Sequence, residues 1–412
     1  MNIINLFLIL SIIVGKIDGV IGPPISEYFG RVVQTAERNN AKLIIFMMDT
    51  PGGLDESMRD IVKTELNSDI PIVIFIYPHG ARCASAGVFI LYAAHFAVMS
   101  HGTNIGSAHP VSISGKMSED MREKITNDAA AYIRSIAKKR NRNIEWAEDA
   151  VRKSVNVTAE EALALNIIDF IADSKEEIVD SLDGKVFNGD TLKLKGEPFI
   201  EMNLTARESF LKTITNPNIA YVLLMLGLYA LIFELMHPGA IFPGVFGAVS
   251  LALALYGLHV LPVNYAGLGL IILGVVLFVL EALTPTFGPF TIGGVTSTIL
   301  GSLLLIRVGA HFLQISRSLI VTVAILFGGF FSFALTMAIK AMRRKPVTGQ
   351  KGYIGRVGKV RQSIKGKKGG VVFLDGALWR AISDEEIKAG ENVEVIDMKG
   401  LVLIVKRTDR MF

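Results

Sequence analysis

A series of apolar segments in the second half of the chain limits its fold more than any other feature. Stretches of bilayer-spanning length occupy Ile219–Met236, Ile241–Val260, Ala266–Leu283, Phe287–Ile306 and Leu319–Ile339. Lipid offers no hydrogen-bond partners, so a segment that crosses the hydrocarbon core has to be a helix or part of a closed barrel. The apolar content of 51% over 412 residues agrees with this. We therefore expect an all-α membrane region of five helices over residues 218–340.

The charges beside these segments predict the orientation of the chain. A basic cluster, Lys340–Lys345, follows the last segment, and such clusters stay on the cytoplasmic side of a membrane. Five spans then place the N-terminal part outside the cytoplasm of a multi-pass cell-membrane protein, although Arg307 and Arg317 would lie in an outer loop. The wider basic run, residues 340–368, fits an anchor near anionic lipid at least as well as a nucleic-acid site. We expect the lipid bilayer, and not nucleic acid, as a partner.

The apolar region contains an internal repeat. Glu234 is followed at offsets of 4 and 13 by Pro238 and Gly247, and Glu281 is followed at the same offsets by proline and glycine. The first four segments therefore look like two copies of one helical hairpin. An ionisable residue near a span is a functional candidate, but both glutamates lie beside the turns, which favours exposure to headgroups or capping of the turn.

The part of the chain before the membrane region predicts an export signal followed by a soluble domain. The run Ile3–Val14, followed by Lys16, is too short to span a bilayer, so residues 1–15 are interpreted as a signal or N-terminal anchor. Over residues 16–200, strand-like runs such as Leu43–Met48 alternate with helix-like runs such as Asp55–Leu66. Apolar strands in alternation with helices are typical of a parallel sheet covered on both faces.

The two remaining segments flank the membrane region. Residues 201–217 are polar and predict a linker, whereas residues 347–412 carry short β-like runs separated by glycine turns. With a helical insert at Asp384–Ala389, this pattern favours a five-stranded barrel of the OB type. Cys83 is the single cysteine, which excludes an intramolecular disulfide and a multi-cysteine zinc site. We expect neither a metal nor a cofactor.

The most informative motif surrounds Ser85. The sequence from Gly80 to Ile90 places this serine among small residues, where a loop becomes an apolar helix. A hydroxyl at a helix start lies near the positive end of the helix dipole, and the N–H of Ala86 can point at the same place. Ser85 is therefore either a nucleophile or a residue that only caps the helix or packs.

A second motif favours the catalytic alternative. Asp49-Thr50-Pro51-Gly52-Gly53 follows a buried strand, and sites in open α/β sheets gather at the carboxyl ends of the strands. Two glycines leave backbone N–H groups bare, so this loop and the Ser85 loop together supply the parts of an acyl-transfer site.

Ser85 also needs a base. His109, in Gly106-Ser107-Ala108-His109-Pro110, is one candidate. Lys124 is the other, because it lies where a polar segment gives way to a helix and could turn inward. A lysine acts as a base only when it is uncharged, which requires burial. The residues alone leave both open.

The three loop motifs, in this order, resemble the membrane-bound serine proteases of the NfeD family, which are related to the Clp protease subunit. The resemblance covers nearly the whole chain, including the membrane region and the OB-like domain. It implies a multidomain fold with a Clp-protease-like α/β domain, and a Ser/Lys dyad of Ser85 and Lys124. It also implies oxyanion donors at Gly53 and Ala86 and substrate contacts at Gly52 and Gly87, with His109 as the alternative base.

What the resemblance implies about function is an ATP-independent endopeptidase that cleaves hydrophobic segments of stomatin-like membrane proteins. We also expect a homo-oligomer, a dimer of the protease domain. Two other functions remain open. A crotonase-like acyl-CoA enzyme would share the oxyanion geometry but would not need Ser85, and a non-catalytic membrane organiser partnering stomatin-like proteins would use the glutamate hairpins and the basic barrel.

Overall fold

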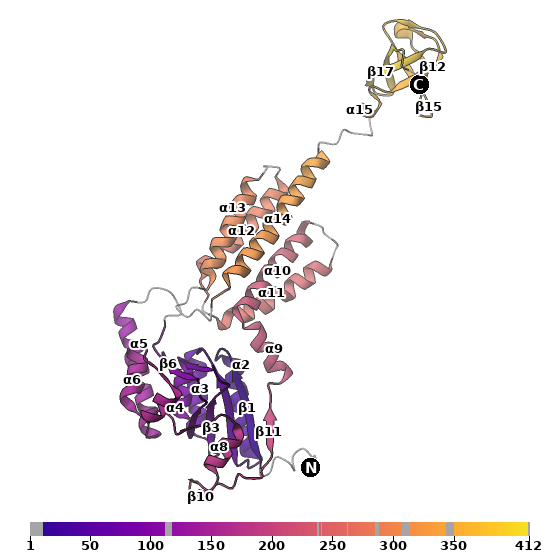
Figure 1. Cartoon of the computed structure of the whole chain (residues 1–412). Coiled ribbons are helices and arrows are strands. Elements are labelled where there is room, and N and C mark those ends of the chain that lie inside the picture. Colours follow the sequence, from indigo (N-terminus) through magenta and orange to yellow (C-terminus); the bar gives the residue numbers. More distant parts are fainter. Residues whose placement is uncertain are drawn as a thin grey trace. The chain divides into compact units, whose positions relative to one another are not determined.

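The chain folds into two compact units that divide between Phe331 and Ser332 (Figure 1). This computed structural model describes residues 11–111, 118–236, 239, 241–261, 263–284, 288–306, 314–342 and 350–410. The first unit holds an α/β domain and most of the apolar helices, and the second holds a closed β-barrel. The three-part fold class predicted from the sequence is confirmed.

A six-stranded parallel sheet forms the centre of the α/β domain. Its order is β11-β1-β2-β3-β5-β8. The strands span Phe199–Met202 (β11), Ile12–Asp18 (β1), Leu43–Asp49 (β2), Ile72–Ile76 (β3), Phe96–Met99 (β5) and Phe170–Ile171 (β8). β2 and β3 are apolar at nearly every position, because parallel strands with both faces covered bury every side chain.

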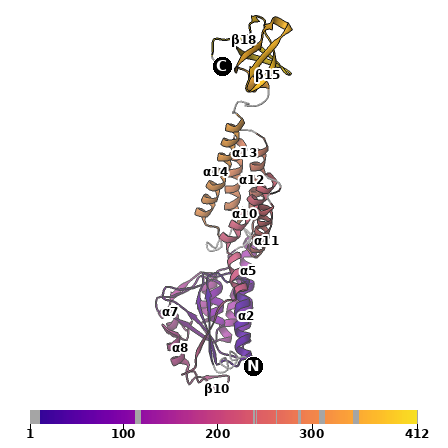
Figure 2. The same ribbon diagram turned by 90° about the vertical axis from the view of Figure 1, so that its right-hand side faces the viewer.

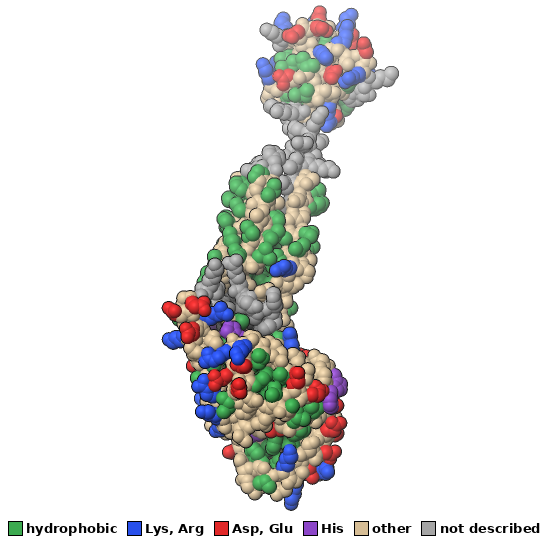
Figure 3. All heavy atoms as spheres, turned by 60° about the vertical axis from the view of Figure 1, so that its left-hand side comes forward, with side chains coloured by type: hydrophobic (Ala, Val, Ile, Leu, Met, Phe, Trp, Pro, Cys, Tyr) green, Lys and Arg blue, Asp and Glu red, His purple; other side chains and the backbone are tan. Residues whose placement is uncertain are grey.

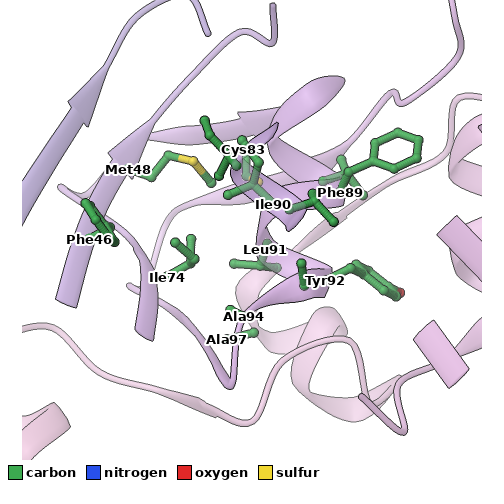
Figure 4. Packing of buried hydrophobic residues seen from close by; sticks show 14 of the residues in the cluster. Phe46, Met48, Ile74, Cys83, Phe89, Ile90, Leu91, Tyr92, Ala94 and Ala97 are labelled. Carbon is green, nitrogen blue, oxygen red and sulfur yellow. The ribbon is translucent and has the colours of Figure 1, made fainter. Parts of the chain in front are cut away.

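Helices cover both faces of this sheet (Figure 2). One face packs on α2 (Pro23–Arg38), α3 (Asp55–Leu66), α4 (Ala86–Ala93), α5 (Glu119–Lys139) and α6 (Ile144–Arg152). Phe46 and Ile74 point into this layer, where Ile74 lies near Leu91 of α4 (Figure 4) and Phe46 stacks on Phe29 of α2 with ring centroids 4.1 Å apart. The opposite face packs on α8 (Lys175–Leu182) through Ile45, Phe75 and their neighbours.

Three smaller strands and a short helix complete the domain. A mixed sheet of β4 (Arg82–Ala84), β6 (Asn104–Gly106) and β7 (Asn156–Thr158) stands beside the carboxyl end of β2. Thr158 and Glu161 form the capping box of α7 (Ala159–Ala164). A two-residue hairpin, β9 (Val186–Phe187) with β10 (Asp190–Thr191), precedes β11.

The structure corrects two predicted boundaries of the α/β domain. β1 begins at Ile12 and pairs with β2 from its first residue, so part of the apolar run assigned to a signal is a buried strand. An apolar run of this length suits either role, and only pairing decides between them. Residues 1–10 lie outside the described residues.

The predicted linker, residues 201–217, is also folded. β11 is the edge strand beside β1, and α9 (Ala206–Ile214) packs on α2. The guanidinium of Arg31 on α2 holds the Glu208 carboxylate of α9 in a two-point ion pair at 2.8 Å. The segment is polar because it lies on the surface of the domain, not because it is unstructured.

Five apolar helices follow. They are α10 (Pro217–Met236), α11 (Phe242–Val260), α12 (Tyr265–Leu283), α13 (Pro289–Leu305) and α14 (Arg317–Met342). In the described residues, α10 and α11 meet the length and hydropathy needed to span a bilayer, and the other three have shorter strongly apolar stretches. Hydrophobic side chains occupy much of the visible surface of these helices (Figure 3). Five spans and their orientation stay predictions.

The internal repeat is visible in the packing of the helices. α10 packs on α11 and α12 on α13, with more contacts than any other pair of elements. A Cβ on Gly247 would lie 3.0 Å from Gly227 O, and one on Gly294 would lie 3.1 Å from Gly274 O. Small residues at matching places therefore let the backbones of both hairpins approach closely.

The repeated glutamates lie at the turns of the hairpins. Glu281 accepts hydrogen bonds from the N–H groups of Gly288 and Thr291 at 2.9 and 3.0 Å, so it caps the start of α13. This confirms the capping interpretation for Glu281. Glu234 lies in the same place against the start of α11, where a Cβ on Gly244 would lie 3.0 Å from its Cγ. Pro238 and Pro285 lie outside the described residues.

The second unit is a closed five-stranded barrel, as predicted for an OB-like domain. Its order is β12-β14-β15-β18-β17. The strands span Val357–Gln362 (β12), Gly370–Leu374 (β14), Ala377–Ile382 (β15), Asn392–Lys399 (β17) and Val402–Arg407 (β18). The helix α15 (Gln350–Tyr353) precedes β12.

The helical insert predicted at Asp384–Ala389 is wrong. Glu386–Ile387 forms strand β16, which pairs with β13 (Ile364–Lys365), and Ile387 is fully buried. The acidic start of this segment favours a helix locally, but burying Ile387 against the barrel outweighs that local preference.

The hydroxyl of Tyr28 gives a test of how α2 is fixed to the sheet. It accepts from Lys16 N–H at 2.9 Å and donates to Met202 O at 2.6 Å, so it joins β1 to β11. Tyr28→Phe removes the partner of both backbone groups at a side chain that is itself fully buried. We expect the free energy of unfolding to fall by about 1–3 kcal/mol, measured by denaturant titration. Tyr265→Phe, at a tyrosine that is 83% exposed, should change nothing.

Candidate active site

Ser85 occupies a strained turn between β4 and α4. Its φ of 55° and ψ of −115° lie in a region that residues with a Cβ rarely adopt, at a cost of about 1–3 kcal/mol. The turn is held by Ser85 N–H, which donates to Gly106 O at 3.2 Å. Ser85 is the N-cap residue of α4, but its side chain makes no capping hydrogen bond. Capping therefore does not explain the serine.

The Asp49–Gly53 loop lies directly against this serine. A Cβ added to Gly52 would lie 2.5 Å from Ser85 Cβ and 3.0 Å from its Oγ. A Cβ on Gly53 would lie 2.0 Å from Ile21 O. Both glycines are therefore required by close approach, and Gly52 also has a φ of +113°.

The backbone hydrogen bonds of the Asp49–Gly53 loop leave the N–H group of Gly53 unused. Gly52 O accepts from Ile21 N–H at 2.9 Å, and Leu54 N–H donates to Ile21 O at 2.8 Å. Among the described residues no acceptor lies within reach of Gly53 N–H. At the start of α4, Ala86 N–H has no partner within its helix either, because the first N–H groups of a helix precede any acceptor. Both predicted oxyanion donors therefore have N–H groups without a hydrogen bond among the described residues; Ala86 follows Ser85 directly, and Gly53 follows Gly52, which lies against Ser85.

Thr50 is a part of the site that the sequence analysis did not single out. Its Oγ1 accepts from Gly52 N–H at 3.0 Å. Its backbone pairs with the serine loop, since Thr50 N–H donates to Arg82 O at 2.8 Å and Ala84 N–H donates to Thr50 O at 3.1 Å. Threonine two residues before a glycine turn is a local signal for such a side-chain bond. Thr50 therefore joins the glycine loop to the serine loop.

Gly87 and Cys83 belong to the interior. A Cβ on Gly87 would lie 2.6 Å from Thr50 Cγ2 and 3.1 Å from Cys83 Sγ. Close packing of α4 on the loops therefore accounts for this glycine. The predicted substrate contact at Gly87 has no support, because the position of its Cβ faces Thr50 and Cys83. Cys83 is fully buried (Figure 4), and burial raises the pKa of its thiol well above the usual value.

Lys124 does not turn inward as predicted. It lies in the second turn of α5 and is exposed, with the exposed side chains of Met121 and Ile125 beside it. Within the described part of the chain no hydrogen bond joins its amine to Ser85. Further along α5, Asp128 pairs with Arg59 of α3 at 2.6 Å, so the body of the helix is fixed to the domain. Lys124 is therefore not the buried base that was expected, because none of the described residues covers the first turns of α5.

His109 is better placed within the domain. It is half-buried, and its Nδ1 lies 2.8 Å from Val151 O. A carbonyl oxygen only accepts, so Nδ1 carries a proton and donates in this contact. The structure therefore brings Ser85, Gly52, Gly53 and Ala86 together and leaves both candidate bases open.

A second polar cluster lies at the carboxyl ends of β3, β5 and β8. Asp173 accepts from the N–H of His101 at 3.0 Å and from the hydroxyl of Ser100 at 2.8 Å. Its second oxygen lies 2.8 Å from Nδ1 of His101. These hydrogen bonds hold the pKa of Asp173 down to about 2. These bonds join the residues that follow β5 to Asp173, two residues after β8. Among the described residues no group of three or more His, Cys, Asp or Glu could hold a metal ion.

Comparisons with known proteins cover all three parts of the chain. The NfeD1b N-terminal domain matches residues 12–196, the NfeD integral membrane domain matches residues 218–337, and the NfeD-like C-terminal, partner-binding domain matches residues 350–407. The membrane-bound protease PH1510 of Pyrococcus horikoshii is 36% identical over 96% of this chain and 92% of its own length. The chain belongs to the NfeD family. This full-length likeness makes it a membrane-bound serine protease.

Two further proteins are similar to this chain. Membrane protein NfeD1b of Bacillus subtilis is 26% identical over 93% of this chain and 89% of its own. The 1510-N membrane-bound stomatin-specific protease, solved as a lysine-to-alanine mutant in complex with a substrate peptide, is 31% identical. That structure covers 50% of this chain and 97% of its own, with a TM-score of 0.46.

Gly52→Ala tests the contact between the two loops of this NfeD-family site. The added methyl group would overlap the Ser85 side chain, so we expect peptide cleavage to fall at least about 100-fold. Gly80→Ala is the matched control, because Gly80 also has a positive φ, of 84°, but faces open space. It should lose some stability and keep its activity. Equal activity of the two variants would show that the loops need not touch.

Proposed function

We propose that the chain hydrolyses peptide bonds with Ser85 as nucleophile and Lys124 as general base. The observation that carries this is the strained turn of Ser85, whose side chain lies against Gly52 while the adjacent Gly53 N–H has no acceptor among the described residues. Strain without a capping bond is expected where a hydroxyl has to be presented to a substrate.

In this mechanism Ser85 Oγ attacks the carbonyl carbon of the scissile peptide and gives its proton to the neutral amine of Lys124. The N–H groups of Gly53 and Ala86 donate to the oxyanion, which is the position where negative charge develops. Lys124 then returns the proton to the leaving amine, and water hydrolyses the acyl-enzyme by the same route. No cofactor, metal or nucleotide takes part in these steps.

The exposed position of Lys124 requires that its part of α5 becomes covered during catalysis. The exposed side chains of Met121 and Ile125 beside it supply an apolar surface for that closure. Bound substrate and a second protease domain can both cover it, and we propose that the enzyme works as a dimer. Removing water from this surface favours the uncharged amine, which is the form that accepts a proton.

We propose stomatin-like membrane proteins, cleaved in an apolar segment, as the substrate. The 1510-N relative is named as a stomatin-specific protease, and the C-terminal barrel matches a partner-binding domain. The chain would thus work as a multi-pass protein of the cell membrane, with the protease domain outside the cytoplasm and the barrel within it. The positive cluster at 340–345 supports this orientation.

Cleavage of a peptide substrate by the full-length protein in detergent tests the dyad. We expect Ser85→Ala to abolish cleavage and Lys124→Ala to lower kcat/KM by about 10²–10⁴-fold, the usual contribution of a general base. Lys138→Ala, at an exposed lysine near the end of the same helix, is the matched control and should be active. Activity retained in Lys124→Ala but lost in His109→Ala would reject the lysine.

The pH dependence separates the two bases independently. A lysine has to lose its proton to act, so kcat/KM should rise from neutral into alkaline pH. A histidine base would give a plateau above about pH 7. Rates measured from acid to alkaline pH with one peptide decide between them, and an early plateau in the wild type would contradict the Lys124 mechanism.

A further inference from the structure

Three helices of the α/β domain carry or border the parts of the candidate active site. α3 begins at Asp55, two residues after Gly53, and α4 begins at Ala86, next to Ser85. α5 carries Lys124 in its second turn. The contacts among these three helices therefore decide where the amine of Lys124 can lie relative to the other parts of the site.

α3 and α5 run in the same direction. The guanidinium of Arg59, near the start of α3, donates to Asp128 of α5 at 2.6 Å. The guanidinium of Arg140, which follows the last residue of α5, donates to the carbonyl of Glu65 near the end of α3 at 3.3 Å. Contacts therefore move towards the ends of both helices together, and the first turns of α5 lie on the side of the glycine loop that precedes α3.

α4 follows the same direction. Phe89, one turn after Ser85, stacks on Tyr132 of α5 with ring centroids 6.0 Å apart. The carbonyl of Ala93, at the end of α4, accepts from Arg140 Nε at 2.7 Å. The starts of α3 and α4 and the first turns of α5 therefore lie at one end of this helical layer, where the serine loop and the glycine loop meet.

Lys124 lies one turn beyond the contact between Arg59 and Asp128 in this direction. Residues four apart share one face of a helix, so Lys124 lies on the face of α5 that Asp128 turns towards α3. Four residues of helix extend over about 6 Å. The contact of Arg59 with Asp128 therefore sets the position from which the Lys124 amine reaches towards Ser85.

Arg59 joins all three helices. Besides Asp128, its guanidinium binds Asp55, the first residue of α3, at 2.7 Å, and lies 4.4 Å from the centroid of the Tyr132 ring. Tyr132 in turn stacks on Phe89 of α4. We call Arg59, Asp55, Asp128, Tyr132 and Phe89 the Arg59 cluster.

The chemistry of the Arg59 cluster needs a guanidinium. A planar guanidinium can donate to two carboxylates while its face lies on an aromatic ring, and a lysine ammonium can do only part of this. Without the cation, the carboxylates of Asp55 and Asp128 would lie near each other and repel. Exposed ion pairs contribute little to global stability, so the cluster fits the fixing of one helix better than the stabilisation of the whole domain.

We propose that Arg59 is a positioning residue of the protease. It holds the first half of α5 against α3 and α4, so that Lys124 stays within reach of Ser85 when the surface around the lysine becomes covered. This role rests on the proposed function, because it takes Lys124 as the base. Arg59 acts through the position of α5 and does not itself contact the reacting atoms.

Hydrogen exchange of the full-length protein in detergent tests the positioning without using activity. We expect Arg59→Ala to speed exchange several-fold over residues 119–128 of α5 and to leave β2 and β3 protected, which shows that the domain stays folded. Arg134→Ala is the matched control, because Arg134 pairs α5 with Glu148 of α6 instead, and it should leave residues 119–128 unchanged. Exchange at the wild-type rate in Arg59→Ala would overturn the proposal.

A double-mutant cycle on peptide cleavage tests the action through Lys124. Arg59→Ala should lower kcat by about 10–100-fold with KM unchanged, because a small displacement of a catalytic group can cost that much. In a Lys124→Ala background the same substitution should have no further effect. A residue with only a structural role would lower both activities by the same factor, and that result would contradict the proposal.

The conservative variant and the lysine variant complete the test. Arg59→Lys keeps the cation but loses the planar contacts, so it should recover only part of kcat, and full activity would argue against the role of the guanidinium. Failure of the dyad gives a different result. Lys124→Ala would then cleave at the wild-type rate, while faster exchange in Arg59→Ala would still support the positioning of α5 by Arg59.

Discussion

The hydrogen bonds of Thr50 hold the candidate active site to the sheet. Thr50 follows the last residue of β2. Its backbone N–H and C=O both form hydrogen bonds with β4, and its hydroxyl oxygen accepts from Gly52 N–H. Because the glycine loop is fixed in this way, its backbone lies against Ser85 and the Gly53 N–H stays unused. A backbone donor fixed before substrate arrives costs no reorganisation in the reaction, which is the main advantage of an oxyanion site made of main-chain atoms.

The proposed base, Lys124, is positioned differently. Ser85 and its donors are set by buried strands and a buried helix, whereas Lys124 lies on the exposed turns of a helix that is fixed only further along, near Asp128. A permanently buried amine would carry a large desolvation cost in every state of the protein. In the mechanism proposed above, an exposed Lys124 avoids this cost until substrate or a second protease domain covers it.

The membrane helices show how a repeat can be stabilised where hydrophobic burial does not drive association. One glycine pair in each hairpin lets its two backbones approach, and Glu281 accepts from two N–H groups at the start of α13. In the first hairpin Glu234 takes the equivalent place against α11. The glutamates therefore fit turn formation better than transport of an ion through the bundle.

The sequence by itself determined the periodic features of this protein. Apolar strands such as β2, the amphipathic helices between them, the apolar helices and the loops around Ser85 and Gly53 were all predicted, because each leaves a local pattern of residues. Pairing across long separations left no such pattern. Only the tertiary structure decided that the run at Ile12 is a central strand, that Ile387 pairs in a strand, and that Thr50 joins two loops. It also decided that Lys124 is exposed, because burial depends on what the rest of the molecule places over a side chain, and no local sequence records that.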